Sequence, residues 1–175
     1  TRIKSEAEAG RLADGRVART WLITNTEKTN YMGQPTGYAL YPTEAPTLMA
    51  DPASSIAERA AFTQKHLWVT KYDPAERYPA GDFVHQNPGG DGLPLYMKDD
   101  RKLDGEDIVL WHTFGPTHFP RPEDWPVMPT DYAKFTLKPY GFFPRNPTLN
   151  VPANEPVKSC SHGHGTQVHS GKSCC

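Results

Sequence analysis

A single histidine in a proline-rich loop is the residue of this sequence best placed to hold a metal ion. His118 follows a strand-like run over residues 107–114, and the stretch from Pro116 to Pro129 contains five prolines. Each proline fixes its own φ angle and restricts the residue before it. The imidazole therefore loses much of its freedom before a ligand arrives, which suits a metal ligand. One histidine is one ligand, so a metal site here needs partners.

Three residues in this loop and in the strand-like run before it have simple structural interpretations when each is considered alone. His118 is most simply a loop histidine that hydrogen-bonds a backbone carbonyl, because most histidines are not metal ligands. His112, inside the strand-like run, is expected to be a hydrogen-bonded core histidine. Asp107, at the start of that run, has a simple interpretation as a strand-start cap, because Asp is common before a strand.

The composition excludes several classes of partner. Hydrophobic residues make up 37% of the 175 residues, charged residues 22%, and the net charge is −1. This balance favours neither nucleic acid nor an anionic membrane surface. No apolar run approaches the roughly 18 residues of a membrane helix, and the polar first residues are not a secretory signal. All three cysteines lie between Cys160 and Cys175, so the body tolerates a reducing compartment and a cytoplasmic or peroxisomal location is favoured over secretion.

The pattern along the chain predicts a mainly β protein with long loops and one short helix. Eighteen prolines and fourteen glycines allow few long helices. Strands are expected over residues 17–24, 37–41, 66–72, 107–114 and 132–138, and a helix from about residue 52 to 64. Ser55 and Glu58 have capping-box spacing at its start. Residues 1–153 are expected to form one folded part, and residues 154–175 a disordered Ser/Gly/His/Cys tail.

Four segments resemble segments of the copper amine oxidases, which are quinone-dependent primary-amine oxidases, and they follow one another in the same order. They read PTLMADPASSIAERAAFTQKHLWVTKY, ERYPAGDFVHQNPGGDGLP, DIVLWHTFGPTHFPRPEDWPVMPTD and GFFPRNPTLNVP. The resemblance covers residues 17–153 and is closest to bacterial and fungal aromatic-amine and histamine oxidases. Pro144 stands where the family usually has Asp, which affects only a local turn. The resemblance implies that the chain is the C-terminal part of the catalytic β-sandwich.

The same resemblance implies two metal sites. Copper in the family is held by three histidines, and His118 matches the third, while Met128 matches a methionine close to the copper. Asp107 and Ile108 match a second site that takes a carboxylate and the next backbone carbonyl. Imidazole suits Cu(II), and carboxylate with carbonyl oxygen suits Ca²⁺ or a similar ion.

For the intact enzyme, the resemblance implies a homodimer that oxidises primary amines with O₂ to aldehyde, ammonia and hydrogen peroxide. Its topaquinone cofactor forms from a Tyr upstream of the matched part, and the catalytic Asp also lies upstream. This chain then carries no catalytic residue and is expected to be inactive alone. The pairs Asn30-Tyr31 and His162-x-His164 look like pieces of the missing sites, but their order and context do not fit.

Two alternatives stay open at this point. The chain can be a standalone β-rich interaction domain whose copper site has decayed. It can also be a metal carrier that works through its His/Cys-rich tail, because short tracts of this kind bind metals. The second alternative predicts that deletion of residues 158–175 abolishes copper uptake.

Overall fold

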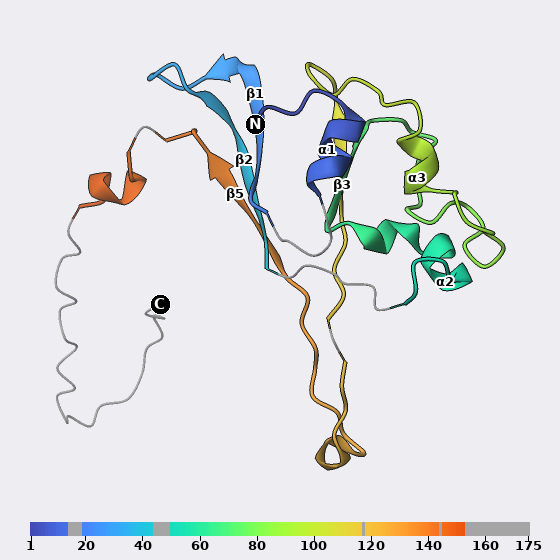
Figure 1. The fold of residues 1–175 in the computed structure, drawn as a ribbon. Coiled ribbons are helices and arrows are strands. Elements are labelled where there is room, and N and C mark those ends of the chain that lie inside the picture. The colour runs from blue at the N-terminus through green and yellow to red at the C-terminus, as the bar shows by residue number, and fades with distance from the viewer. Residues whose placement is uncertain (14–18, 44–49, 117, 144, 153–175) are drawn as a thin grey trace, which may run out of the picture. The chain divides into compact units, whose positions relative to one another are not determined.

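The computed structural model describes residues 1–13, 19–43, 50–116, 118–143 and 145–152, which fall into two compact units, Thr1–Pro144 and Arg145–Cys175. Strand residues outnumber helical residues in the first unit (Figure 1), so the predicted mainly β class is confirmed. The second unit contains the short 3₁₀ helix η3, Pro147–Asn150. The predicted tail, residues 154–175 with its cysteines and histidine pair, lies outside the described residues.

Two antiparallel sheets form the framework. The first has the strand order β1-β2-β5, and the second pairs β3 with β4. The strands are β1 Trp21–Thr29, β2 Pro35–Pro42, β3 Leu67–Lys71, β4 Ile108–His112 and β5 Phe135–Tyr140. All five predicted strands are present. β1 extends beyond the predicted strand end at residue 24, because it continues to Thr29 as an exposed polar arm that pairs with β2 across a register shift.

The predicted helix after residue 52 is shorter than expected. α2 spans Ser55–Arg59 and is followed by the 3₁₀ helix η1, Ala61–Gln64. Its N-cap is Ser54, whose hydroxyl accepts a hydrogen bond from the Ala57 amide at 3.4 Å, rather than the predicted Ser55. Two further helices were not predicted, α1 Glu6–Leu12 and α3 Leu93–Tyr96.

The sequence of α1 contains a capping motif, although its apolar residues show no clear helical period. Ser5 is the N-cap of α1 and accepts from the Glu8 amide at 3.5 Å, while the Glu8 side chain accepts from the Lys4 amide at 2.8 Å. Ser-x-x-Glu is the spacing of a capping box. Apart from its first residue, the helix buries only the small residues Ala9 and Gly10. Small residues give a weak hydrophobic period, so hydrophobic periodicity does not predict a helix here.

The core lies between the sheets and under α1. Its buried members are Ala9, Ala13, Trp21, Leu40, Leu67, Val69 and Leu103, with Ile108 and Leu110 packed against them. The Trp21 indole N–H donates to Nε2 of the fully buried His66 at 2.8 Å, which connects β1 to the start of β3. β4 is less buried than these core residues, because every one of its residues is half-buried.

Candidate functional site

His118 lies on one limb of the long loop between β4 and β5. The loop runs out along one limb, turns at the 3₁₀ helix η2, Pro122–Asp124, and returns along a second limb (Figure 1). Nδ1 of His118 lies 2.5 Å from Oδ2 of Asp131, so the contact joins the two limbs. The His118 side chain is 49% exposed, and Nε2 has no hydrogen-bond partner among the described residues. The histidine that the sequence predicts to be conformationally restricted therefore has a specific partner, Asp131.

The turn of this loop is held by a local ion pair. Oδ2 of Asp124 accepts from the Arg121 amide at 2.8 Å, and Oδ1 accepts from the Arg121 guanidinium at 3.0 Å. These contacts lower the pKa of Asp124, the guanidinium hydrogen bond having the largest effect. Asp124 is buried in a loop that is otherwise mostly exposed. Proline and this short-range pair, rather than core packing, shape the loop around His118.

The His118 imidazole and the nearby Met128 side chain are of types that fit part of a copper site. His118 offers an imidazole, a ligand type suited to Cu(II), and the Met128 side chain lies half-buried further along the same loop. Within the described ranges, no group of three or more His, Cys, Asp or Glu side chains is arranged so that it could hold a metal ion. The predicted roles of His118 and Met128 therefore stay predictions.

Asp107 and Ile108 lie where the 100–107 loop enters β4. The Tyr72 amide donates to the Asp107 carbonyl at 2.8 Å, which makes this a hydrogen-bonded pair of the antiparallel ladder. Bonded and non-bonded pairs alternate, so the next pair, Lys71 with Ile108, is non-bonded. The Ile108 carbonyl therefore points away from β3, toward the β4 edge that no described strand covers.

The Asp107 carboxylate is exposed and makes no hydrogen bond or ion pair with a described residue. The neighbouring acidic side chains, by contrast, form ion pairs. Asp104 pairs with Arg2 at 2.6 Å, and Glu106 pairs with Lys71 at 2.9 Å. The hydrogen bond from its cationic partner lowers the pKa of each of these two carboxyls. A free carboxylate beside an outward-pointing carbonyl fits a hard-cation ligand pair, although the role stays a prediction.

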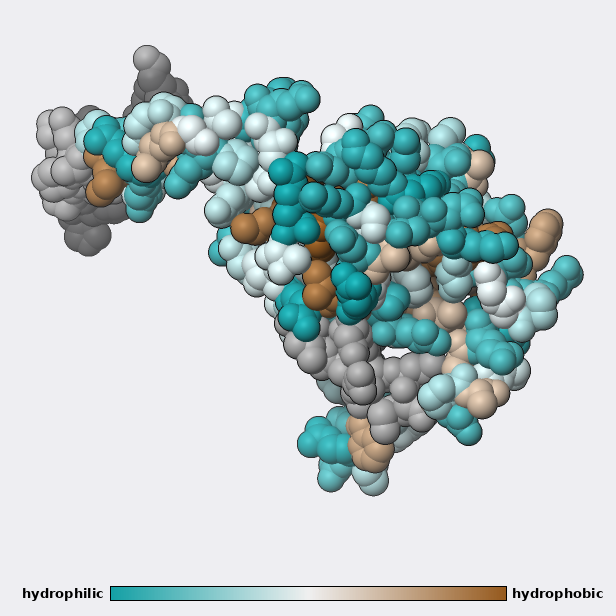
Figure 2. Space-filling model, turned by 45° about the horizontal axis from the view of Figure 1, so that its top comes forward, coloured by the Kyte–Doolittle hydropathy of each residue, from teal (hydrophilic) through white to brown (hydrophobic). Residues whose placement is uncertain are grey.

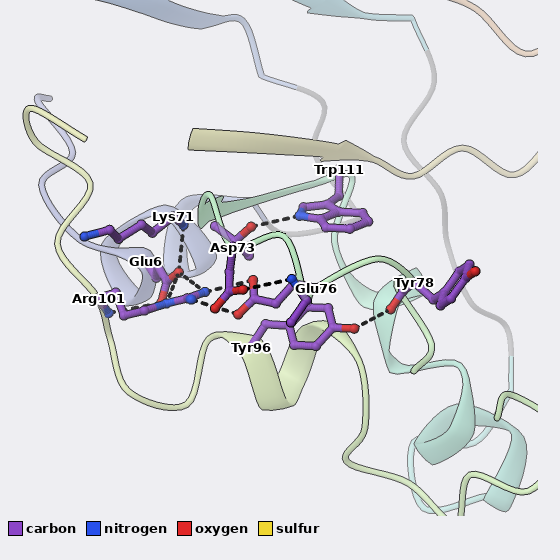
Figure 3. Close-up of polar contacts among 10 residues, drawn as sticks. Glu6, Lys71, Asp73, Glu76, Tyr78, Tyr96, Arg101 and Trp111 are labelled. Atoms are coloured by element: carbon purple, nitrogen blue, oxygen red, sulfur yellow. Dashed lines mark hydrogen bonds and ion pairs between the residues drawn. The ribbon is translucent and has the colours of Figure 1, made fainter. Parts of the chain in front are cut away.

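Sequence reasoning missed the buried ion-pair cluster beside this strand end (Figure 3). Glu6 is fully buried, and its carboxylate lies 2.7 Å from the Arg101 guanidinium, which also contacts Glu76 at 2.8 Å. Charge-assisted hydrogen bonds to both carboxylates raise the pKa of Arg101, the bond to Glu76 having the largest effect. No local signal identifies such a cluster, because its members are far apart in the sequence.

His112 lies on the core side of β4 but is not the hydrogen-bonded histidine that was predicted. Its ring is 5.1 Å from the Phe135 ring and 6.1 Å from the Phe114 ring. Both ring nitrogens are buried without a partner among the described residues. The strand places the side chain between aromatic rings, so no polar group of the described chain reaches it. Burial, with a smaller effect of His66, lowers the pKa of His112.

We expect His112→Phe to stabilise the protein by about 1 kcal/mol, because an apolar ring replaces buried, unsatisfied nitrogens. The lowered pKa also predicts a pH dependence. As pH falls below about 6.5, the unfolded chain binds a proton that the folded chain resists, so wild-type stability is full above this pH and declines below it. Urea titrations between about pH 5 and 7.5 should show a shallower decline in the variant.

Exposed His85 provides the matched control, since His85→Phe makes the same substitution without relieving buried nitrogens. A His112→Phe variant that is less stable than the wild type, with an unchanged pH slope, would contradict this account of the His112 ring.

The Asn30-Tyr31 pair has a structural role. Oδ1 of Asn30 accepts from the Met32 amide at 2.9 Å and from the Gln34 amide at 3.0 Å, which shapes the turn between β1 and β2. Tyr31 is 75% exposed. An asparagine that bonds the backbone two residues on is typical of turns, so this geometry accounts for the pair without a cofactor.

Comparison with known proteins decides the family. The sequence model described as "Copper amine oxidase, enzyme domain" matches residues 1–158. The chain belongs to the copper amine oxidase family. It is 57% identical over 154 residues to a histamine oxidase of Arthrobacter globiformis, a match that covers 88% of this chain and 22% of that protein. It is 46% identical over 161 residues to a peroxisomal copper-containing diamine oxidase of Nicotiana tabacum, covering 91% of this chain and 20% of that protein.

A solved structure agrees with the sequence match. The copper-containing benzylamine oxidase of Hansenula polymorpha is similar with a TM-score of 0.69 and 38% identity, covering 77% of this chain and 21% of that one. This copper amine oxidase chain therefore spans about a fifth of the length of these relatives. Copper and topaquinone are the cofactors that the family implies.

The face shown in Figure 2 is largely hydrophilic, with scattered hydrophobic side chains. Among the described residues, no helix is both long enough and apolar enough to span a membrane.

Proposed function

We propose that this chain is the C-terminal segment of a copper-containing primary-amine oxidase. The observation that carries the proposal is the match over residues 1–158, which includes His118 in a THxPRxEDWP segment of the kind found in the family. The intact enzyme would convert primary amines and O₂ to aldehyde, ammonia and hydrogen peroxide. Copper and topaquinone would supply the redox chemistry when bound, and the quinone-forming Tyr and the catalytic Asp would lie upstream.

Within that enzyme, His118 would be the third copper ligand, with Met128 close to the metal. The exposed ring and its position on a proline-rich loop support this role, because a ligand needs an accessible nitrogen and a restricted side chain. The loop limbs would present the imidazole, and the Arg121–Asp124 pair would keep the turn between them closed. The enzyme would be a homodimer, in the cytoplasm or in peroxisomes, the latter being the location in the name of a tobacco relative.

Asp107 and Ile108 would form part of a second, calcium-like site. Two observations support this assignment. The Asp107 carboxylate makes no hydrogen bond or ion pair with a described residue, and the Ile108 carbonyl points away from β3. Two oxygen donors fall short of the roughly six to eight that Ca²⁺ usually takes. The remaining ligands would come from water and from other parts of the enzyme.

Activity of the separate chain tests the proposal that it is one segment of the enzyme. We expect residues 1–175 alone to produce no amine-dependent hydrogen peroxide, and a longer polypeptide that adds the upstream residues to produce it. A peroxidase-coupled assay with a panel of primary amines measures both. Amine-dependent peroxide from residues 1–175 alone would overturn the segment proposal. A longer polypeptide that binds no copper would favour the interaction-domain alternative.

A further inference from the structure

The buried carboxylate of Glu6 occupies the position that a neighbouring strand would take at the end of β3. Because Lys71 and Ile108 form a non-bonded pair, the Lys71 amide points away from β4, and it donates to Oε1 of Glu6 at 2.9 Å. The following amide, that of Tyr72, donates to the Asp107 carbonyl at 2.8 Å. One side chain of α1 thus fixes the β3 backbone directly opposite the two candidate ligand residues.

The same carboxylate fixes the loop that leads into the candidate site. Oε2 of Glu6 accepts from the Arg101 amide at 3.0 Å, and Oε1 accepts from Arg101 Nε at 2.9 Å. In the other direction, the Glu6 amide donates to the Arg101 carbonyl at 3.1 Å. Two residues further on, the Leu103 amide donates to the Lys4 carbonyl at 2.8 Å. The loop is therefore attached to α1 shortly before it reaches Asp107.

Glu76 completes the arrangement from the segment after β3. It pairs with the far side of the Arg101 guanidinium at 2.8 Å, so this side chain is held between two carboxylates (Figure 3). Glu6 is fully buried, and the Arg101 side chain is 23% exposed. A forked, buried pair of this kind fixes geometry more tightly than a surface ion pair does.

We propose that Glu6, through Arg101 and the Lys71 amide, is a positioning residue for the cation site at Asp107 and Ile108. The inference rests on the proposed second metal site and adds the group that sets its geometry. Metal affinity depends on how well outer groups hold the ligands, commonly by a factor of about 10 to 100. Loss of the Glu6 carboxylate should therefore weaken the site without removing a ligand.

The test compares Glu6→Gln with Asp107→Asn and with Glu8→Gln in the complete oxidase, by calorimetric titration with CaCl₂ after chelator treatment. Every contact of the Glu6 carboxylate described above is with a donor, so the side-chain amide that Glu6→Gln introduces places an N–H against another N–H. Glu8→Gln is the matched control, because its carboxylate on the same helix accepts from the exposed Lys4 amide and takes no part in the buried cluster. We expect the Ca²⁺ dissociation constant to rise about tenfold in Glu6→Gln, to rise at least as much in Asp107→Asn, and to stay unchanged in Glu8→Gln.

The outcomes separate the two proposals. If Asp107→Asn leaves Ca²⁺ binding unchanged, the second metal site itself is wrong. If Asp107→Asn weakens binding while Glu6→Gln binds as the wild type does, only the positioning role is overturned. Arg101→Lys keeps the charge but loses the forked donors, and we expect it to weaken binding several-fold; it replaces Glu6→Gln if that variant does not fold. Wild-type Ca²⁺ affinity in Arg101→Lys would then overturn the positioning role.

Discussion

Replacing His118 with alanine should cost the complete oxidase its copper and, with it, amine oxidation. The variant removes a metal-binding nitrogen, and a change of metal ligand should cost more than the roughly 10- to 100-fold that outer groups contribute. We therefore expect copper affinity and turnover to fall by more than about 100-fold. Elemental analysis after dialysis and a peroxide assay with a primary amine measure the two quantities.

The matched control removes the other histidines that look like ligands. A double His162→Ala/His164→Ala variant should retain the copper content and turnover of the wild type. If the double variant loses copper and His118→Ala retains it, the metal-carrier alternative is correct and the assignment of His118 is wrong.

Replacing Arg101 with alanine should be among the most destabilising single changes in this chain. The substitution leaves the fully buried Glu6 carboxylate without its cationic partner. Removing one partner of a buried ion pair typically costs about 3–5 kcal/mol. Urea denaturation of residues 1–175, followed by tryptophan fluorescence, measures this loss as a lower transition midpoint at an unchanged slope.

An exposed ion pair on the same loop sets the comparison. The Arg2–Asp104 contact is short, at 2.6 Å, but the Arg2 side chain is 58% exposed. Surface pairs contribute about 0–1 kcal/mol, so Asp104→Ala should change the free energy of unfolding by less than about 1 kcal/mol. Equal losses in Arg101→Ala and Asp104→Ala would show that burial of Glu6 does not determine the effect.

The strands were predictable where β-forming residues are concentrated. Residues 66–72 and 107–114 contain β3 and β4 entirely, because branched and aromatic side chains fit a half-buried pleated surface. The polar end of β1 was missed, since hairpin pairing with β2 rather than apolar burial holds it extended. α1 was missed because alanine gives little hydrophobic contrast, although its capping residues were visible.

The sequence predicted which residues belong to the candidate sites, but not how those residues are arranged in space. His118, Met128, Asp107 and Ile108 were identified from a motif, which carries residue identity but not contacts. The His118–Asp131 contact depends on how two loop limbs meet, and the Glu6–Arg101 pair joins residues 95 positions apart. Local periodicity cannot encode such separations. The unpartnered nitrogens of His112 likewise depend on the aromatic rings that the tertiary fold brings around them.

The most direct test is a crystal structure of the copper-loaded complete oxidase with an anomalous difference map collected at the copper absorption edge. We expect the copper peak within bonding distance of a ring nitrogen of His118, with the other histidine ligands supplied by upstream residues. A copper peak on the tail histidines His162 and His164, with the His118 ring unliganded, would contradict the assignment of His118 as the third copper ligand.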